Sequence, residues 1–119
     1  MVEAMEAPTS HLVILTTVGD RQAGLRIARE LVSRRLAGCV NVVGPMRSFY
    51  RWKGEVQEEA EYMLVIKTTR ENFERIALAL KPLHPYELPE LIAFSIEAGD
   101  ETYLNWLTAS SSETPGDLP

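Results

Sequence analysis

The stretch that decides the fold is 40-VNVVGPMRSFYRWKGEVQEEAEYMLVIKTT-69. Two extended segments, 40–53 and 56–69, flank Gly54 and Glu55, an arrangement typical of a β-hairpin. A strand of 14 residues extends about 45 Å at 3.3 Å per residue, which exceeds the roughly 30 Å diameter of a domain of this size. The sequence therefore predicts a hairpin that projects from the domain.

The outer part of this hairpin carries three aromatic side chains, Phe49, Tyr50 and Trp52. Aromatic residues seldom lie on a free protruding ribbon unless they meet another surface. Gly44-Pro45 indicates a bulge or bend along the first strand. Towards its end the second strand is apolar on both faces, which indicates a sheet covered on two sides. We expect an obligate homo-oligomer in which the hairpins pair with neighbouring copies and the three aromatics form the interface.

The segments on either side of the hairpin complete a mixed fold. "HLVILTTV" at 11–18 predicts a buried strand, and Asp20 is placed to cap a helix that Gly38 ends. After the hairpin, Thr69 is a candidate cap for a second helix that Pro82 and Pro85 end. Residues 90–98 predict a fourth strand, and residues 101–109 predict a short final helix. The order βαββαβ plus a helix predicts the α+β, ferredoxin-like arrangement with an antiparallel sheet.

The length of 119 residues is that of one domain. Residues 1–10 read as a flexible leader, residues 11–109 as the single folded domain, and the Ser- and Pro-rich residues 110–119 as a disordered tail.

Composition excludes several function classes. The single cysteine, Cys39, rules out an intramolecular disulfide and any CxxC motif. The net charge of −5 argues against nucleic-acid binding. The acidic start lacks the positive and apolar regions of a secretory signal, and no apolar run is long enough to span a membrane. We therefore expect a cytoplasmic protein with neither nucleic acid nor membrane as its partner.

The most unusual short segment is "HPYELPE" at 84–90. Its two prolines push His84 and Leu88 into extended conformations. The His84 imidazole suits a metal ion, or it hydrogen-bonds a carbonyl group as many histidines before a bend do. Cys39 is similarly open to two readings, a thiolate ligand for copper or a small buried apolar residue.

Several spaced motifs together resemble the CutA divalent-cation-tolerance family: "GCVNVV", "SFYRWKGEV", "LVIKTT", "LHPYELPE" and "YLNWL". The match runs from about Leu12 to Leu107 and keeps the motifs in order. The resemblance implies a trimeric assembly with a ferredoxin-like subunit. It also implies a connection to copper and other divalent cations.

Residue by residue, the resemblance carries two groups of positions over to this chain. Cys39 and His84 fall where the proposed metal-coordinating residues of the family lie. A cleft between subunits is implied to be lined by Trp52, Glu59, Lys67, Tyr86 and Glu90. With one thiolate and one imidazole, we expect weak and exchangeable binding of copper, with zinc second.

Three functions compete at this point. The first is a non-catalytic homotrimer that binds a divalent cation or a small ligand between subunits and serves metal tolerance and homeostasis. The second is a signalling module similar to the PII proteins, which binds a nucleotide or another small anion in the same cleft. The third, an acylphosphatase-type enzyme, would need a phosphate-cradling loop, and "TTVGDRQAG" is a poor one. Because the chain shows neither an activated nucleophile nor a GxSxG elbow, we expect no catalytic residues.

Overall fold

The structure, a computed structural model, describes residues 10–113. The bounds of its elements are as follows: β1 His11–Val18, α2 Arg21–Ser33, β2 Cys39–Trp52, β3 Glu55–Thr69, a 3-10 turn Arg70–Asn72, α3 Phe73–Leu83, β4 Ile92–Ser95 and α4 Glu101–Ser110. This order confirms the predicted βαββαβ arrangement with a final helix.

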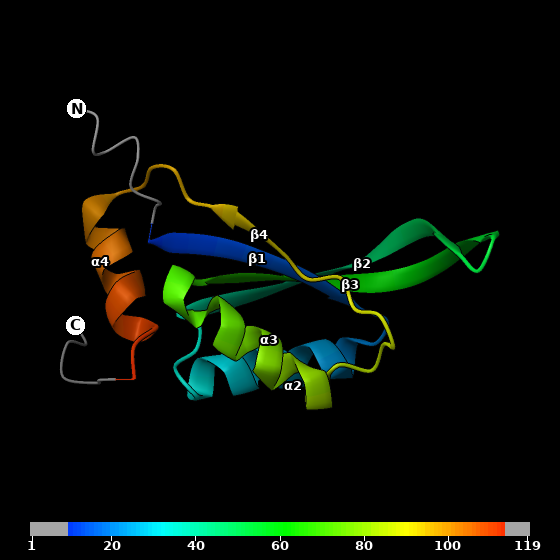
Figure 1. The fold of residues 1–119 in the computed structure, drawn as a ribbon, viewed down its shortest axis with the longest axis horizontal. Coiled ribbons are helices and arrows are strands. Elements are labelled where there is room, and N and C mark those ends of the chain that lie inside the picture. The colour runs from blue at the N-terminus through cyan, green and yellow to red at the C-terminus, as the bar shows by residue number, and fades with distance from the viewer. Residues whose placement is uncertain (1–9, 114–119) are drawn as a thin grey trace.

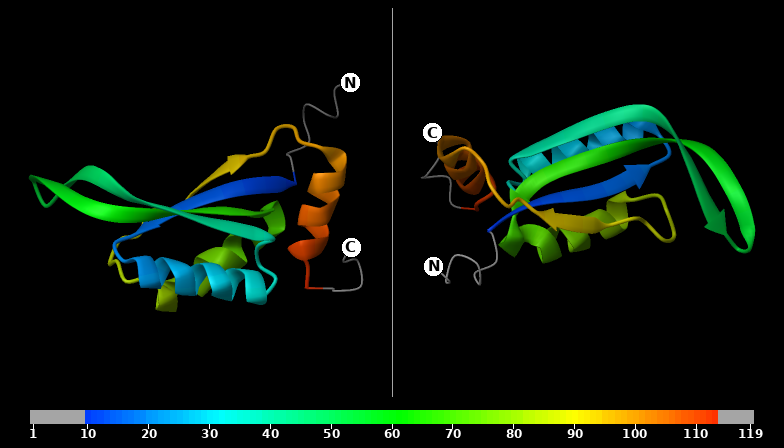
Figure 2. Two further views of the ribbon diagram at one scale, coloured as in Figure 1. Left: turned by 180° about the vertical axis from the view of Figure 1, so that it is seen from behind. Right: turned by 90° about the horizontal axis from the view of Figure 1, so that it is seen from above.

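The four strands form one antiparallel sheet in the order β2-β3-β1-β4. Helices α2 and α3 cover one face of it, and α4 stands at the end of the sheet away from the hairpin tip (Figures 1 and 2). The core lies between the sheet and α2 and α3, and its fully buried members include Ile14, Ile27, Leu31, Leu64, Ile66 and Ile76. Their burial is the main source of the subunit's stability.

The other face of the sheet is largely apolar, and none of the helices within residues 10–113 covers it (Figure 2). Directly paired residues share a face, so the register places Val13, Lys67 and Phe94 together on this side. Phe94 is 54% exposed and Ile92 46% exposed, both on the edge strand β4, so this face presents large apolar side chains to solvent. This surface, called the open face below, matches the second apolar face predicted from the sequence.

The β2–β3 hairpin projects well beyond the rest of the subunit, as predicted (Figure 1). Its pairing register shifts between Val43 and Met46, where Gly44 has φ +150°. Gly44-Pro45 is therefore a bulge, as the sequence indicated. Because a bulge inserts one residue in one strand only, the even-numbered residues of β2 beyond it share a face with the odd-numbered residues before it.

Helix α2 begins as expected and ends earlier than expected. The Asp20 carboxylate accepts hydrogen bonds from the backbone amides of Gln22 and Ala23. The helix stops at Ser33, five residues before Gly38, and Arg35 takes the left-handed conformation at φ +60°. The Arg35 side chain explains this early end of the helix. Its guanidinium donates 2.6 Å hydrogen bonds to the carbonyls of Ala109 and Ser112, and these bonds hold the residue in place.

The segment after the hairpin also differs in detail from the prediction. Thr69 precedes the 3-10 turn without a capping hydrogen bond from its side chain. Helix α3 runs through Pro82 to Leu83. Strand β4 has four residues, shorter than the nine predicted over 90–98. Pro89 lacks an amide donor, which limits how far this edge strand extends at its start.

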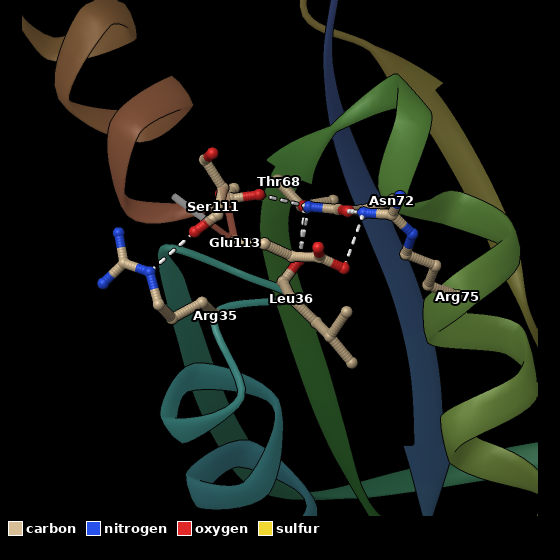
Figure 3. Close-up of polar contacts among 8 residues, drawn as sticks. Arg35, Leu36, Thr68, Asn72, Arg75, Ser111 and Glu113 are labelled. Atoms are coloured by element: carbon tan, nitrogen blue, oxygen red, sulfur yellow. Dashed lines mark hydrogen bonds and ion pairs between the residues drawn. The ribbon is translucent and has the colours of Figure 1, made fainter. Parts of the chain in front are cut away.

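The first residues of the predicted disordered tail belong to the fold. Asn72 is buried, and its amide nitrogen donates to the carbonyls of Leu36 and Ser111 at 3.1 and 2.6 Å and to the Thr68 hydroxyl at 3.2 Å (Figure 3). Ser111 is 3% exposed. Residues 110–113 are therefore packed against the domain rather than part of a tail. Residues 1–9 of the predicted leader and 114–119 of the tail lie outside the described residues.

Candidate functional site

A cavity of about 840 Å³ lies between the outer half of the β2–β3 hairpin and the bend of residues 84–90. The hairpin contributes Met46, Ser48, Tyr50, Trp52, Glu61 and Met63, and the bend contributes Tyr86 and Glu90 among others. The bulge at Gly44-Pro45 is what puts Tyr50 and Trp52 on the same face as Glu61. We call this the hairpin cavity.

The bend is tied to the hairpin by one short hydrogen bond in this cavity. The Tyr86 hydroxyl donates to Glu61 Oε2 at 2.6 Å, and Glu61 is only 6% exposed. Burial and the Glu61 carboxylate together raise the pKa of Tyr86 strongly, so the phenol stays protonated and remains a donor. A β-carbon on Gly19 would lie 2.9 Å from the Tyr86 hydroxyl, so the glycine leaves room for this bond.

His84 is held at the end of β1 and uses both ring nitrogens inside the subunit. It has the extended conformation expected before a proline, with φ −84° and ψ 130°. Its Nδ1 accepts from the Tyr86 amide at 3.2 Å, so the proton is on Nε2, which donates to the Thr17 carbonyl at 2.8 Å. Burial lowers the pKa of His84, with the Thr17 hydrogen bond and Glu61 acting in the opposite direction. Within one chain, His84 therefore hydrogen-bonds a carbonyl group, which was one of the two roles that the sequence left open for it.

Cys39 lies elsewhere. It pairs with Lys67 at the start of β2, on the open face, and its thiol is 3.9 Å from Asn41 Oδ1. Lys67 Nζ donates to the same oxygen at 2.7 Å. The contacts of His84 are with Thr16 and Thr17, four residues further along the register, a displacement of about 13 Å along the strands.

Within one chain, then, Cys39 and His84 do not form a joint metal site. Thr16, which the His84 ring contacts, points into the core on the helix side, whereas the Cys39 thiol is on the open face. Among residues 10–113, no group of three or more His, Cys, Asp and Glu side chains is placed to hold a metal ion. A site that uses both residues has to draw them from different subunits, and that version stays a prediction.

The implied cleft residues divide into three groups. Trp52, Tyr86 and Glu90 line the hairpin cavity. Glu59 pairs with Ser48 and lies next to the cavity. The pKa of Tyr50 is raised first by desolvation of its phenol and then by the hydrogen bond to Glu59 and the charge of that carboxylate. Lys67 is six residues from Glu61 along β3, about 20 Å away, so it does not reach the cavity of its own chain.

Glu61 is the site residue that sequence reasoning missed. It lies in "EVQEEAEY", a run of charges that reads as a solvated strand. Only the shift of register at Gly44-Pro45 and the position of Tyr86 reveal that Glu61 is buried while Glu58 and Glu59 are exposed. The bulge itself was the one available signal, because it changes which residues of β2 face inward.

The cavity is strongly acidic. Glu61, Glu87 and Glu90 line it, and Arg51 is the one basic residue among its lining residues within the described chain. Strand alternation places Arg51 on the other face of the hairpin from Tyr50 and Trp52. The negative charge therefore dominates the interior, which favours a cationic ligand over an anionic one.

The interface residues predicted at the hairpin tip are unevenly exposed. Phe49 is 65% and Tyr50 39% exposed, and Trp52 is half-buried. Lys53 Nζ lies 5.7 Å from the centre of the Trp52 ring.

Across residues 10–113, no helix is long and apolar enough to cross a membrane.

Comparisons with known proteins agree with this architecture. Residues 12–110 match the family described as CutA1 divalent ion tolerance protein. The chain is 45% identical over 95 residues to the divalent-cation tolerance protein CutA of Thermus thermophilus, covering 80% of this chain and 92% of that one. It is 37% identical over 113 residues to the chloroplastic protein CutA 1 of Oryza sativa, covering 95% of this chain and 64% of the rice protein's length.

Solved structures give the same result for the fold. The Thermus thermophilus protein superposes with a TM-score of 0.84 at 42% identity, over 86% of this chain and 99% of that chain. The match covers the sheet, the helices and the projecting hairpin in one continuous domain. The chain belongs to the CutA1 divalent ion tolerance protein family.

Proposed function

We propose that the protein is a non-catalytic homotrimer that binds a divalent cation weakly and exchangeably and contributes to metal tolerance. The observation that carries this proposal is the match to the divalent ion tolerance family over residues 12–110, joined to relatives named divalent-cation tolerance proteins. A cytoplasmic location goes with this proposal, although two of the relatives are named chloroplastic.

Assembly is supported by two surfaces of the subunit. The open face exposes Ile92 and Phe94 on the edge strand β4, and the hairpin tip exposes Phe49. Burying such side chains against another copy stabilises an oligomer by about 25 cal/mol per Å² of apolar area. The projecting hairpin also has free edges that a neighbouring sheet can extend.

For the metal we propose copper ahead of zinc, with Cys39 as the principal ligand. The Cys39 thiol is partly exposed on the open face, where another subunit can supply the remaining ligands. His84 is the second proposed ligand. Its Nδ1 accepts a hydrogen bond from the Tyr86 amide, so this bond must break before Nδ1 can bind a metal ion. A thiolate favours soft cations, and so few protein ligands imply weak binding.

The PII-like alternative, a nucleotide or other small anion in the cleft, finds less support. Within one chain, Glu61, Glu87 and Glu90 repel the phosphates of a nucleotide. An anion site would require basic side chains from neighbouring copies, such as Lys67.

Titration of the metal-free protein, purified without an affinity tag, tests the proposal. We expect copper to bind, zinc to bind more weakly and ATP not to bind. Cys39→Ala should lower copper affinity more than His84→Ala, with Thr102→Ala on the exposed side of α4 as the control. Unchanged copper affinity in both variants contradicts the site, and saturable ATP binding without copper binding favours the PII-like alternative.

A further inference from the structure

We propose that the outer face of α2 is a docking surface for an acidic peptide segment of a partner protein. This surface, called the arginine face below, consists of Arg21, Gln22, Leu25, Arg26 and Arg29. The inference goes beyond the proposed function, because it involves neither a metal ion nor the contacts between copies. Three features support it: positive charge in an acidic chain, arginines without carboxylate partners, and a hollow between their side chains.

The charge around α2 is opposite in sign to that of the whole chain. Residues 20–35 contain five arginines against Asp20 and Glu30, a net charge of +3, whereas the chain carries −5. The Asp20 carboxylate already accepts two backbone amides of the first helical turn, and Glu30 lies 3.8 Å from Arg34. Because the Debye length is about 8 Å at physiological ionic strength, a partner in contact with α2 responds to this local charge.

The three arginines of the face have no carboxylate partner within the described part of the chain. Arg21, Arg26 and Arg29 are exposed, and none of them makes an ion pair or a side-chain hydrogen bond there. By contrast, Arg47 on β2 and Arg75 on α3 each pair with a glutamate. A guanidinium keeps its charge at every physiological pH and donates two parallel hydrogen bonds to a carboxylate, so the arginine face suits an acidic partner.

The spacing of these side chains suits a short segment that lies along α2. Arg21, Leu25 and Arg29 follow one another at intervals of four residues, so they form one row on the helix. Arg26 is three residues before Arg29 and stands beside this row. At 1.5 Å per residue the row is about 12 Å long, which is about two turns of a helical partner.

A hollow on the arginine face adds an apolar contact. Its volume is about 330 Å³, and it is lined by Gln22, Leu25, Arg26, Arg29 and Glu30. Leu25 is half-buried and is the apolar member of this set, so an apolar side chain of the partner can pack there while its carboxylates meet the guanidinium groups. Arginine is also enriched at protein interfaces and among the residues that contribute most of the binding energy.

The arginine face stays accessible in the proposed trimer. Assembly is proposed to bury the open face and the hairpin, whereas α2 covers the opposite face of the sheet (Figure 2). No element of residues 10–113 lies over the outer side of α2. A trimer therefore presents three copies of this face, which raises the apparent affinity for a partner that carries repeated acidic segments.

Nucleic acids and anionic membranes are poorer matches for this face. Both are extended polyanions whose binding depends on many cationic contacts, and three arginines supply few of them. Outside residues 20–35 the chain carries 15 of its 17 Asp and Glu residues, which repel a large negative surface that approaches the subunit. A short peptide avoids most of this repulsion because it contacts α2 alone.

Fluorescence anisotropy with the full chain tests the proposal. The probe is a labelled twelve-residue peptide in which pairs of glutamates alternate with single leucines. We expect saturable binding that weakens as salt is added, and binding about three- to tenfold weaker when Arg26→Gln and Arg29→Gln are combined. Arg29→Gln alone should weaken binding measurably, whereas Lys81→Gln, which removes the same charge from the exposed side of α3, should bind as the wild type does.

Two results of this titration would overturn the inference. One is the absence of saturable peptide binding, and the other is an equal loss in Arg29→Gln and Lys81→Gln, which would show attraction to net charge alone. An oligonucleotide of thymidines and a phosphatidylserine vesicle are the competing probes. If either binds more tightly than the peptide and is weakened by Arg29→Gln, the face belongs to that class of partner and the peptide proposal is wrong.

A second measurement locates the peptide without any substitution. In a titration followed by amide chemical shifts, the perturbed signals should belong to residues 21–33 of α2. Peptide-induced shifts confined to other elements would contradict the arginine face.

Discussion

The Tyr86 hydroxyl donates a 2.6 Å hydrogen bond to the buried carboxylate of Glu61, and this bond joins the proline-rich bend to the projecting hairpin. The two residues come from segments 25 positions apart in the chain. Their bond sets one wall of the hairpin cavity, so the shape of the cavity depends on it. The same bond provides the first prediction.

Tyr86→Phe removes the donor and leaves the carboxylate buried. We expect the free energy of unfolding to fall by about 1–3 kcal/mol, the usual penalty for a buried polar group without its partner. Chemical denaturation at fixed chain concentration measures this change. Tyr103→Phe on α4, where the tyrosine is 41% exposed, is the matched control and should be close to neutral. Equal stability in both variants would show that the bond contributes nothing.

His84 predicts a pH dependence whose sign follows from its environment. Burial lowers its pKa in the folded chain below the ordinary 6.5, so the unfolded chain binds the proton more readily. Its contribution to stability is therefore complete above about pH 6.5 and is lost as the pH falls from there towards the lower folded pKa.

Denaturation of wild type and His84→Gln at a series of pH values checks this effect. The uncharged glutamine can still donate to the Thr17 carbonyl but does not titrate. The loss of stability between pH 7 and 5 should be smaller in His84→Gln than in wild type, because other groups titrate in both. Identical pH profiles would mean that the histidine is not buried in its neutral form.

The Asn72 side chain predicts how the C-terminal segment is held. Its amide nitrogen bonds carbonyls at Leu36 and Ser111, which belong to different parts of the chain. Asn72→Ala should lower the free energy of unfolding by about 1–3 kcal/mol and expose residues 110–113 to proteases. Asn105→Ala on the exposed side of α4 is the control. Unchanged proteolysis of this segment in Asn72→Ala would contradict the role of the Asn72 side chain in holding it.

Much of the fold follows from local sequence patterns. The projecting hairpin, the Asp20 cap and the element order were all predictable, because strand length, capping and periodicity depend on neighbouring residues. The end of α2 was not, because Arg35 is held by carbonyls some 75 positions away. Residues 110–113 were predicted to be a disordered tail for the same reason, because their contacts are with residues distant in the sequence.

The site was less predictable than the fold. Trp52, Tyr86 and Glu90 were assigned to a cleft between subunits through the family resemblance; within one chain they line the hairpin cavity, and the cleft between subunits stays a prediction. Glu61 was missed because burial of one carboxylate in a charged strand depends on a bulge and a distant tyrosine. Cys39 and His84 lie apart within one chain, which sequence spacing does not reveal because it does not show where along a strand or on which face each residue lies. A site shared between subunits stays a prediction.

The hairpin tip provides a test of assembly. Trp52→Glu places a charge at the proposed interface, so it should weaken the oligomer and lower its thermal midpoint together. Light scattering and thermal denaturation over a dilution series measure both. Thr102→Glu makes the same change of charge on α4 and should leave assembly intact. Normal assembly in Trp52→Glu would assign the tip to ligand binding instead.

The trimer is the central claim, because the open face, the hairpin tip and any joint use of Cys39 and His84 all depend on neighbouring copies. Multi-angle light scattering of the wild-type chain at micromolar concentration tests it most directly. The account predicts a single species of about 40 kDa, three times the 13.4 kDa of one chain. A stable species of 13.4 kDa under the same conditions would contradict it.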